Sequence, residues 1–232
     1  MNEKQKLYIV GDEQLVHEWK SFCETKGFFI QTNGNQTDNI FLCIELTLFD
    51  EQKKKANLEF LSAQFPNTPI LTSSITITAI QQSIWLNGTS QLLGISAFPT
   101  FLQRELIEVA SPPNITKETW ETIQSFFLQI EKQFSVVQDR VGMVLPRIIC
   151  MLVNEAFFAL QEEIATPEAI DTAMKLGTNY PFGPIEWGEK IGYENVVAVL
   201  STLHKELGDD RYRVAPLLRQ VSLEKKSVVS SQ

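Results

Sequence analysis

The chain reads GMVLPRIICMLVNEAFFAL over residues 142–160, ATPEAIDTAMKLGTNYPFGPIEWGEKIG over 165–192 and LHKELGDDRYRVAPLLR over 203–219. Apolar residues recur in all three segments at the three-to-four spacing that is typical of helices packed on one another. Short turn-forming stretches separate them, such as YPFGP at 180–184. These features predict an all-helical C-terminal domain.

The boundaries of two helices can be predicted from single residues. We expect a first helix within 142–163, and a second that begins at Thr166 as N-cap with Pro167 at its first position. Gly177 is expected to end the second helix. The face of the first helix that is predicted to pack consists of Val144, Ile148, Leu152, Ala156 and Phe157 or Leu160.

The residues in front of this domain alternate between apolar strand-like runs and helical patterns. The predicted strands are LYIVG (7–11), FFIQT (28–32), IFLCIEL (40–46), TPILTSS (68–74), LLGISAF (92–98), ELIEVA (105–110) and FSVVQ (134–138). Thr116 is a suitable cap for the helix before the last strand. Continuous apolar runs favour parallel strands that are covered on both faces. The predicted fold class is therefore α/β, a Rossmann-like doubly wound sheet followed by an all-α C-terminal domain.

The expected organisation is a degenerate Rossmann-like domain at 1–139, a helical domain at 140–222 and a polar tail at 223–232. Of the 232 residues 28 are acidic and 20 basic, giving a net charge of −8, which argues against a nucleic-acid binder. The sequence has neither a signal-peptide pattern nor an apolar run of the roughly 18–20 residues that a membrane span needs. Three scattered cysteines and two histidines leave no metal-binding motif. We expect a reduced, soluble, cytoplasmic protein.

The turn after the first predicted strand tests whether the fold binds a dinucleotide. The fingerprint G-x-G-x-x-G would place glycines at three positions, which here are Gly11, Glu13 and Val16. Glu13 puts a carboxylate where the backbone should approach a pyrophosphate, and Asp12 is expected to be the N-cap of the following helix. The second strand ends in Thr32, followed by Asn33, Gly34 and Asn35, without the acid that binds ribose hydroxyls. Gly11 remains as the candidate cofactor-binding residue, and no cofactor is expected.

The helical segments and the strand ends together resemble the 3-hydroxyacyl-CoA dehydrogenase family along nearly the whole chain. The resemblance aligns LTSSI with the family's NTSSL and so implies that Ser73 lies beside the substrate. The family's catalytic motif G-x-H-F-F-N-P aligns with GISAFP, which places Ser96 at the position of the general-base histidine. The family's supporting glutamate, twelve residues later, aligns with Glu108. The candidate catalytic residues implied by the resemblance are Ser96, Glu108 and Ser73.

Several other family positions are altered, because Pro99 and Pro146 stand in place of asparagines and Phe49 in place of a glutamate. The favoured hypothesis is a catalytically eroded family member that binds an acyl-CoA-like small molecule and forms a homodimer through its helical domain. One alternative is an active NAD(P)-dependent oxidoreductase, using NAD(H), with a rearranged site at Ser73, Ser96 and Glu108. Another is a structural subunit that pairs with an active paralogue.

Overall fold

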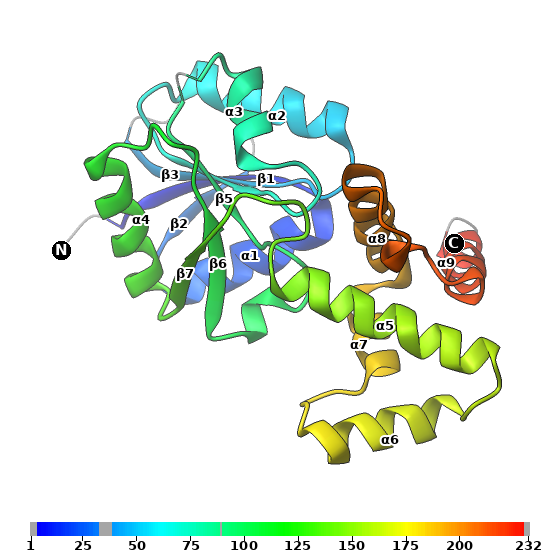
Figure 1. Ribbon diagram of the computed structural model, residues 1–232. Coiled ribbons are helices and arrows are strands. Elements are labelled where there is room, and N and C mark those ends of the chain that lie inside the picture. The colour runs from blue at the N-terminus through cyan, green and yellow to red at the C-terminus, as the bar shows by residue number, and fades with distance from the viewer. Residues whose placement is uncertain (1–3, 33–38, 89, 230–232) are drawn as a thin grey trace. The chain divides into compact units, whose positions relative to one another are not determined.

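A computed structural model describes residues 4–32, 39–88 and 90–229 (Figure 1). The chain divides into two compact units, Met1–Met143 and Val144–Gln232. The first unit is an α/β sheet domain and the second consists of helices. The predicted fold class is thereby confirmed.

The first unit is built on one seven-stranded sheet in the described residues, ordered β2-β1-β3-β4-β5-β6-β7. All neighbouring strands are parallel except β5 and β6. Figure 1 shows α2 and α3 together on one side of the sheet and α1 on the other. The elements are β1 Lys6–Gly11, α1 Glu13–Thr25, β2 Phe29–Gln31, β3 Ile40–Leu46, α2 Glu51–Gln64, β4 Ile70–Ser73, α3 Ala79–Trp85, β5 Leu92–Ile95, a 3₁₀ turn Phe101–Gln103, β6 Leu106–Ala110, α4 Lys117–Gln129 and β7 Gln133–Val137.

The core of the first unit lies on both faces of the central strands. Cys43 and Ile44 of β3 point to opposite faces of the sheet and are both fully buried, as expected for a strand with helices on both sides. On the α1 side, Trp19 of α1 stacks on Phe126 of α4 with ring centroids 6.5 Å apart. Aromatic rings bury large areas and so contribute strongly to packing. The two helices are therefore fixed side by side by their aromatic side chains.

The three cysteines, Cys23, Cys43 and Cys150, are buried free thiols. Burial raises the pKa of Cys23 and of Cys43 to about 12, and it raises the pKa of Cys150 as well. The thiols are therefore protonated at neutral pH and act as small apolar side chains.

The predicted strands of the first unit are all confirmed within a few residues, and Thr116 caps α4 by accepting the Thr119 N–H at 3.2 Å. Helix α3 was not predicted. It begins at a capping box in which the Thr78 hydroxyl accepts the Gln81 N–H and the Gln81 side chain accepts the Thr78 N–H. This short helix connects β4 to β5 on the α2 side of the sheet.

The second unit consists of five helices in the described residues. Buried polar side chains fix its turns. The Asp171 carboxylate accepts the N–H groups of Ile185 and Glu186 at 2.8 and 3.1 Å, which caps α7. Asn154 bonds the Arg213 carbonyl and the Ala215 N–H, holding the chain before the last helix. The elements are α5 Leu145–Gln161, α6 Pro167–Thr178, α7 Pro184–Ile191, α8 Tyr193–Leu207, a 3₁₀ turn Asp210–Tyr212 and α9 Pro216–Val229.

Two predictions about these helices are wrong. Val144 and Ile148 are each 49% exposed, whereas Ala156 and Phe157 are buried as predicted, on a face that also carries Ile149, Cys150 and Val153. Helix α6 continues through Gly177 and stops at Asn179, which adopts the left-handed conformation with φ of 57°. Residues 223–229, predicted as part of a polar tail, continue α9. In the part of the chain that is described, no helix has the length and hydropathy of a membrane span.

Candidate active site

Two of the candidate catalytic residues, Ser96 and Glu108, face each other across the antiparallel pair β5 and β6. Ser96 follows β5 and is fully buried, while Glu108 in β6 is 6% exposed. Their main chains are bonded through the Ser96 N–H and the Glu108 carbonyl at 3.0 Å. The Ser96 Oγ accepts the Glu108 N–H at 3.2 Å. The serine hydroxyl therefore satisfies the backbone of the neighbouring strand.

An arginine that the sequence analysis missed lies beside this pair. Arg104, on the segment before β6, donates from Nη2 to the Ser96 carbonyl at 3.4 Å. Burial lowers the pKa of its guanidinium to about 10, and the nearby Glu108 carboxylate opposes that shift. Arg104 therefore remains a cation at neutral pH and supplies the opposite charge to Glu108.

Lys132 holds the segment that carries Arg104. Its Nζ donates to the carbonyls of Leu102 and Arg104, both at 2.7 Å. Burial lowers the pKa of Lys132, and the neighbouring Lys26 and Arg104 charges lower it further. Because the ammonium bonds both carbonyls, the turn before β6 is fixed and the arginine is kept at the strand end.

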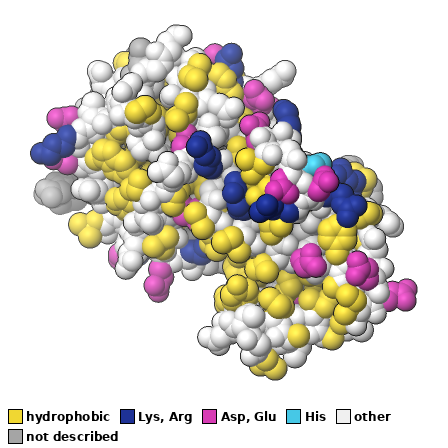
Figure 2. Space-filling model, viewed as in Figure 1, with side chains coloured by type: hydrophobic (Ala, Val, Ile, Leu, Met, Phe, Trp, Pro, Cys, Tyr) yellow, Lys and Arg dark blue, Asp and Glu magenta, His cyan; other side chains and the backbone are white. Residues whose placement is uncertain are grey.

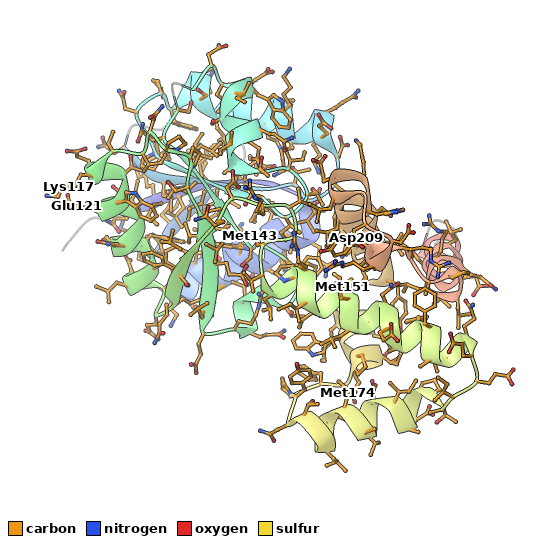
Figure 3. All side chains as sticks on the ribbon, viewed as in Figure 1. Lys117, Glu121, Met143, Met151, Met174 and Asp209 are labelled. Atoms are coloured by element: carbon orange, nitrogen blue, oxygen red, sulfur yellow. The ribbon has the colours of Figure 1, made fainter. Side chains whose placement is uncertain are left out.

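Ser73, the third candidate, ends β4 next to β5. It is buried, and its Oγ donates to the Ala97 carbonyl at 3.5 Å. The next residue, Ser74, donates to the sulfur of Met143 at 3.7 Å. Figure 3 labels Met143 near the ends of the strands. The structure thus brings Ser73 close to the segment that follows Ser96, as the sequence predicted for a shared site.

A buried ionic network lies on the α2 side of the same strands. The Lys54 ammonium bonds the Glu45 carboxylate, the Thr72 hydroxyl and the Ser73 carbonyl. Glu45 and Lys54 are 0% and 1% exposed. Burial lowers the pKa of Lys54, and the Glu45 charge opposes that shift. This network, which the sequence analysis also missed, fixes β3, β4 and α2 together.

The turn between β1 and α1 has Asp12 at the predicted N-cap position, but the side chain of Asp12 bonds elsewhere. Asp12 occupies the N-cap position of α1, but its side chain makes no capping hydrogen bond. Its Oδ2 accepts the N–H of Leu48 at 2.9 Å, and its Oδ1 accepts from Lys53 Nζ at 3.0 Å. The Asp12 side chain therefore bonds the loop between β3 and α2, while its carbonyl accepts the Val16 N–H of its own helix at 2.9 Å.

Doubly wound sheets often bind the pyrophosphate of a dinucleotide at the turn after the first strand. A Cβ on Gly11 would lie 2.5 Å from the Leu46 carbonyl carbon, so the space beside this glycine is filled by β3. Asp12 already occupies the Leu48 N–H, and Glu13 adds an exposed carboxylate. In this arrangement the turn does not fit a pyrophosphate.

A cavity of about 450 Å³ lies next to this turn. Four elements line it: the end of β1, one side of α1, the residue that follows β2, and one residue of α2. The lining residues are Ile9, Val10, Gly11, Glu13, Val16, His17, Lys20, Thr32 and Asn57. Asn33, Gly34 and Asn35, which were compared with the ribose-binding position, lie outside the described residues. Among the described residues no group of three or more His, Cys, Asp or Glu side chains is arranged to hold a metal ion.

Comparison with known proteins identifies the family. The family model for the 3-hydroxyacyl-CoA dehydrogenase C-terminal domain matches residues 142–231. A 3-hydroxybutyryl-CoA dehydrogenase from Clostridioides difficile is 33% identical over 193 residues, covering 82% of this chain and 68% of that relative. A second, from Bradyrhizobium diazoefficiens, is 32% identical over 180 residues, which cover 76% of this chain and 61% of that relative.

A solved structure shows the same fold. The (S)-3-hydroxybutyryl-CoA dehydrogenase from Ralstonia eutropha superimposes with a TM-score of 0.79 at 22% identity, covering 94% of this chain and 93% of that structure. The sequence relatives extend across both units, because the first of them covers more of this chain than either unit contains. The resemblance seen in the sequence is therefore confirmed, and this chain belongs to the 3-hydroxyacyl-CoA dehydrogenase family.

Proposed function

We propose that this chain is a member of the family that binds an acyl-CoA-like ligand without carrying out histidine-assisted dehydrogenation. The observation that carries the proposal is Ser96, which stands at the aligned position of the general-base histidine and is fully buried. Its Oγ accepts the Glu108 N–H, and the Glu108 carboxylate lies near the Arg104 cation. The site therefore presents a serine whose hydroxyl is already hydrogen-bonded and a carboxylate close to a cation.

The chemistry of the family requires a group that removes the proton of the 3-hydroxyl while hydride leaves the carbon. A neutral imidazole, with a pKa near 6.5, suits that task at neutral pH, and general-base catalysis contributes roughly 10²–10⁴-fold in rate. The two histidines of the chain lie elsewhere. His17 is an exposed residue of α1, and His204 of α8 lies 3.6 Å from the Asp210 carboxylate. Neither is on the strand ends that carry Ser96 and Glu108.

The first test is calorimetry on the purified chain with NADH, and separately with acetoacetyl-CoA. We expect no binding of NADH at micromolar concentrations and a saturable heat of binding from the CoA ester. We also expect Ser96→His to show no NADH-dependent turnover, because Asp12 and Glu13 still occupy the cofactor turn. Turnover in this variant, or micromolar NADH binding by the unmodified protein, would contradict the proposal.

The second candidate function is an active NAD(P)-dependent 3-hydroxyacyl-CoA oxidoreductase, which requires NAD(H). Two observations favour it: the dehydrogenase names of the relatives at 32–33% identity and the convergence of Ser73, Ser96 and Glu108 at neighbouring strand ends. The 450 Å³ cavity beside β1 also leaves room for part of a nucleotide. Oxidation of NADH with acetoacetyl-CoA by the unmodified protein would select this function over the first.

We further propose that the second unit pairs with a second copy of itself. Its helix α6 exposes 83% of Leu176, and Ile164 just before α6 is 69% exposed. Figure 2 shows hydrophobic side chains gathered over the part of this unit that α5 and α6 form. Exposed apolar clusters of this kind mark interaction surfaces. The competing proposal is that a longer dehydrogenase binds this surface in place of a second copy of the chain.

Light scattering on the purified protein is expected to give twice the chain mass of 26.4 kDa. Leu176→Asp should shift the mass toward a monomer, because a charge in an apolar contact is costly. The matched control is Leu128→Asp on α4 of the first unit, where the leucine is 80% exposed. A monomeric unmodified protein, or equal loss of dimer in both variants, would argue against this interface.

A further inference from the structure

The crevice between β1 and β3 is the place where an open α/β sheet ordinarily binds a ligand. The chain leaves β1 toward β2 on one side, while β3 lies on the other, so the order of the strands reverses at β1. Helices α1 and α2 accordingly lie on opposite sides of the sheet (Figure 1). Crevices outside the carboxyl ends of strands at such a switch point are the usual ligand sites of these folds.

In this chain one side chain links the residues that follow β1 and β3 at this switch point. Asp12 follows β1, and its two carboxylate oxygens bond the Leu48 N–H and the Lys53 ammonium, both beyond the end of β3. The two strands are already close there, because Gly11 pairs with Leu46 and the Asp12 N–H contacts the Leu46 carbonyl at 3.5 Å. The contacts of Asp12 therefore join the end of β1 to the segment that follows β3.

The two groups that Asp12 binds are the kind that receive an anion. A backbone N–H and a lysine ammonium at the start of a helix are typical donors to phosphate or carboxylate oxygens. Asp50 already caps the same helix by accepting the Lys53 N–H at 2.9 Å. The cap of α2 therefore does not depend on Asp12. The Leu48 N–H and the Lys53 ammonium can bind another anion while Asp50 still caps the helix.

We infer that Asp12 is an internal anion that closes the crevice between β1 and β3 against the pyrophosphate of an adenine dinucleotide. The inference rests on the proposed function, since it explains why the cofactor turn of this family member does not fit its cofactor. The closure is weak. The side chains of Asp12 and Lys53 are 37% and 44% exposed, and ion pairs at that exposure contribute little to stability. Removing the carboxylate should therefore open the crevice without unfolding the sheet.

The test uses ADP-ribose, which carries the pyrophosphate but no nicotinamide, in calorimetric titrations of the full chain. Asp12→Ala is expected to bind ADP-ribose at least about tenfold more tightly than the unmodified protein, because two donors are freed and one negative charge is removed. Asp12→Asn should fall between the two, because its amide oxygen can still accept the Leu48 N–H. It also serves as the second variant if Asp12→Ala does not fold, as judged by circular dichroism.

The matched control is Asp50→Asn, which removes the same charge from the same loop and keeps the helix cap, since asparagine caps as well as aspartate. Its affinity for ADP-ribose should stay within about twofold of that of the unmodified protein. Equal tightening in the Asp12 and Asp50 variants would mean that net charge alone acts, and it would overturn the inference. So would folded Asp12 variants that bind no more tightly than the unmodified protein. The proposed function is tested separately, by NADH turnover in the unmodified protein.

Discussion

Lys54→Met is expected to lower the free energy of unfolding of the first unit by about 3–5 kcal/mol, the usual cost of removing one partner of a buried ion pair. Glu45 is fully buried, so without the ammonium its carboxylate would be left charged in the core. The Thr72 hydroxyl and the Ser73 carbonyl would also lose a donor. Urea unfolding followed by circular dichroism measures the loss.

Lys55→Met is the matched control for this prediction. Lys55 is the next residue of the same helix, but it is 49% exposed and its ion pair with Glu59 spans 3.9 Å. Its replacement should change stability by no more than about 0.5 kcal/mol. The double variant Glu45→Leu with Lys54→Met should recover much of the loss, because both charges leave the core together. A Lys54→Met variant as stable as Lys55→Met would show that the buried pair does not hold β3 to α2.

The sequence was sufficient to predict the strands, because a parallel sheet covered on both faces needs continuous apolar runs. The run at 40–46 is β3 from end to end. The same run contains a residue that indicates a buried ion pair. Glu45 stands inside an otherwise apolar run, and a buried carboxylate requires a cation partner. The partner, Lys54, is the middle of three consecutive lysines, and periodicity alone could not select it.

The packed face of α5 could not be predicted from spacing. This helix carries apolar residues on every side, so Val144 and Ile148 fit a helical stripe as well as Ile149 and Val153 do. Only the neighbouring helices decide which stripe is buried. The predicted end of α6 was wrong for a different reason. Gly177 and Asn179 both tolerate a left-handed conformation, and the helix ends at the asparagine.

The three candidate site residues lie at neighbouring strand ends, but the charged groups around them were not predicted. A twelve-residue spacing shared with the family singled out Ser96 and Glu108, and the antiparallel register of β5 and β6 brings them opposite each other. Arg104 was missed because a single arginine before a strand reads as a surface charge. Its role depends on the turn that Lys132 closes, a contact 28 residues apart in the sequence.

Gly11→Ala is expected to lower the free energy of unfolding by about 2–6 kcal/mol, whatever the role of the turn in binding. Two costs add: a side chain at a backbone φ of +141°, about 1–3 kcal/mol, and overpacking against β3, also about 1–3 kcal/mol. The added Cβ would lie within 2.7 Å of the Leu46 backbone. Gly11 was predicted as a cofactor-binding residue, and its packing against Leu46 gives it a structural reason to be glycine.

Gly27→Ala separates the two costs. Gly27 follows α1 with φ of +89°, and a Cβ there would meet nothing within 4 Å. This variant therefore carries the backbone strain alone, and we expect it to lose about 1–3 kcal/mol. The excess loss in Gly11→Ala then measures the contact with β3. If the two variants unfold at the same urea concentration, β3 relaxes away from the added Cβ, and the contact with Leu46 does not require a glycine at this position.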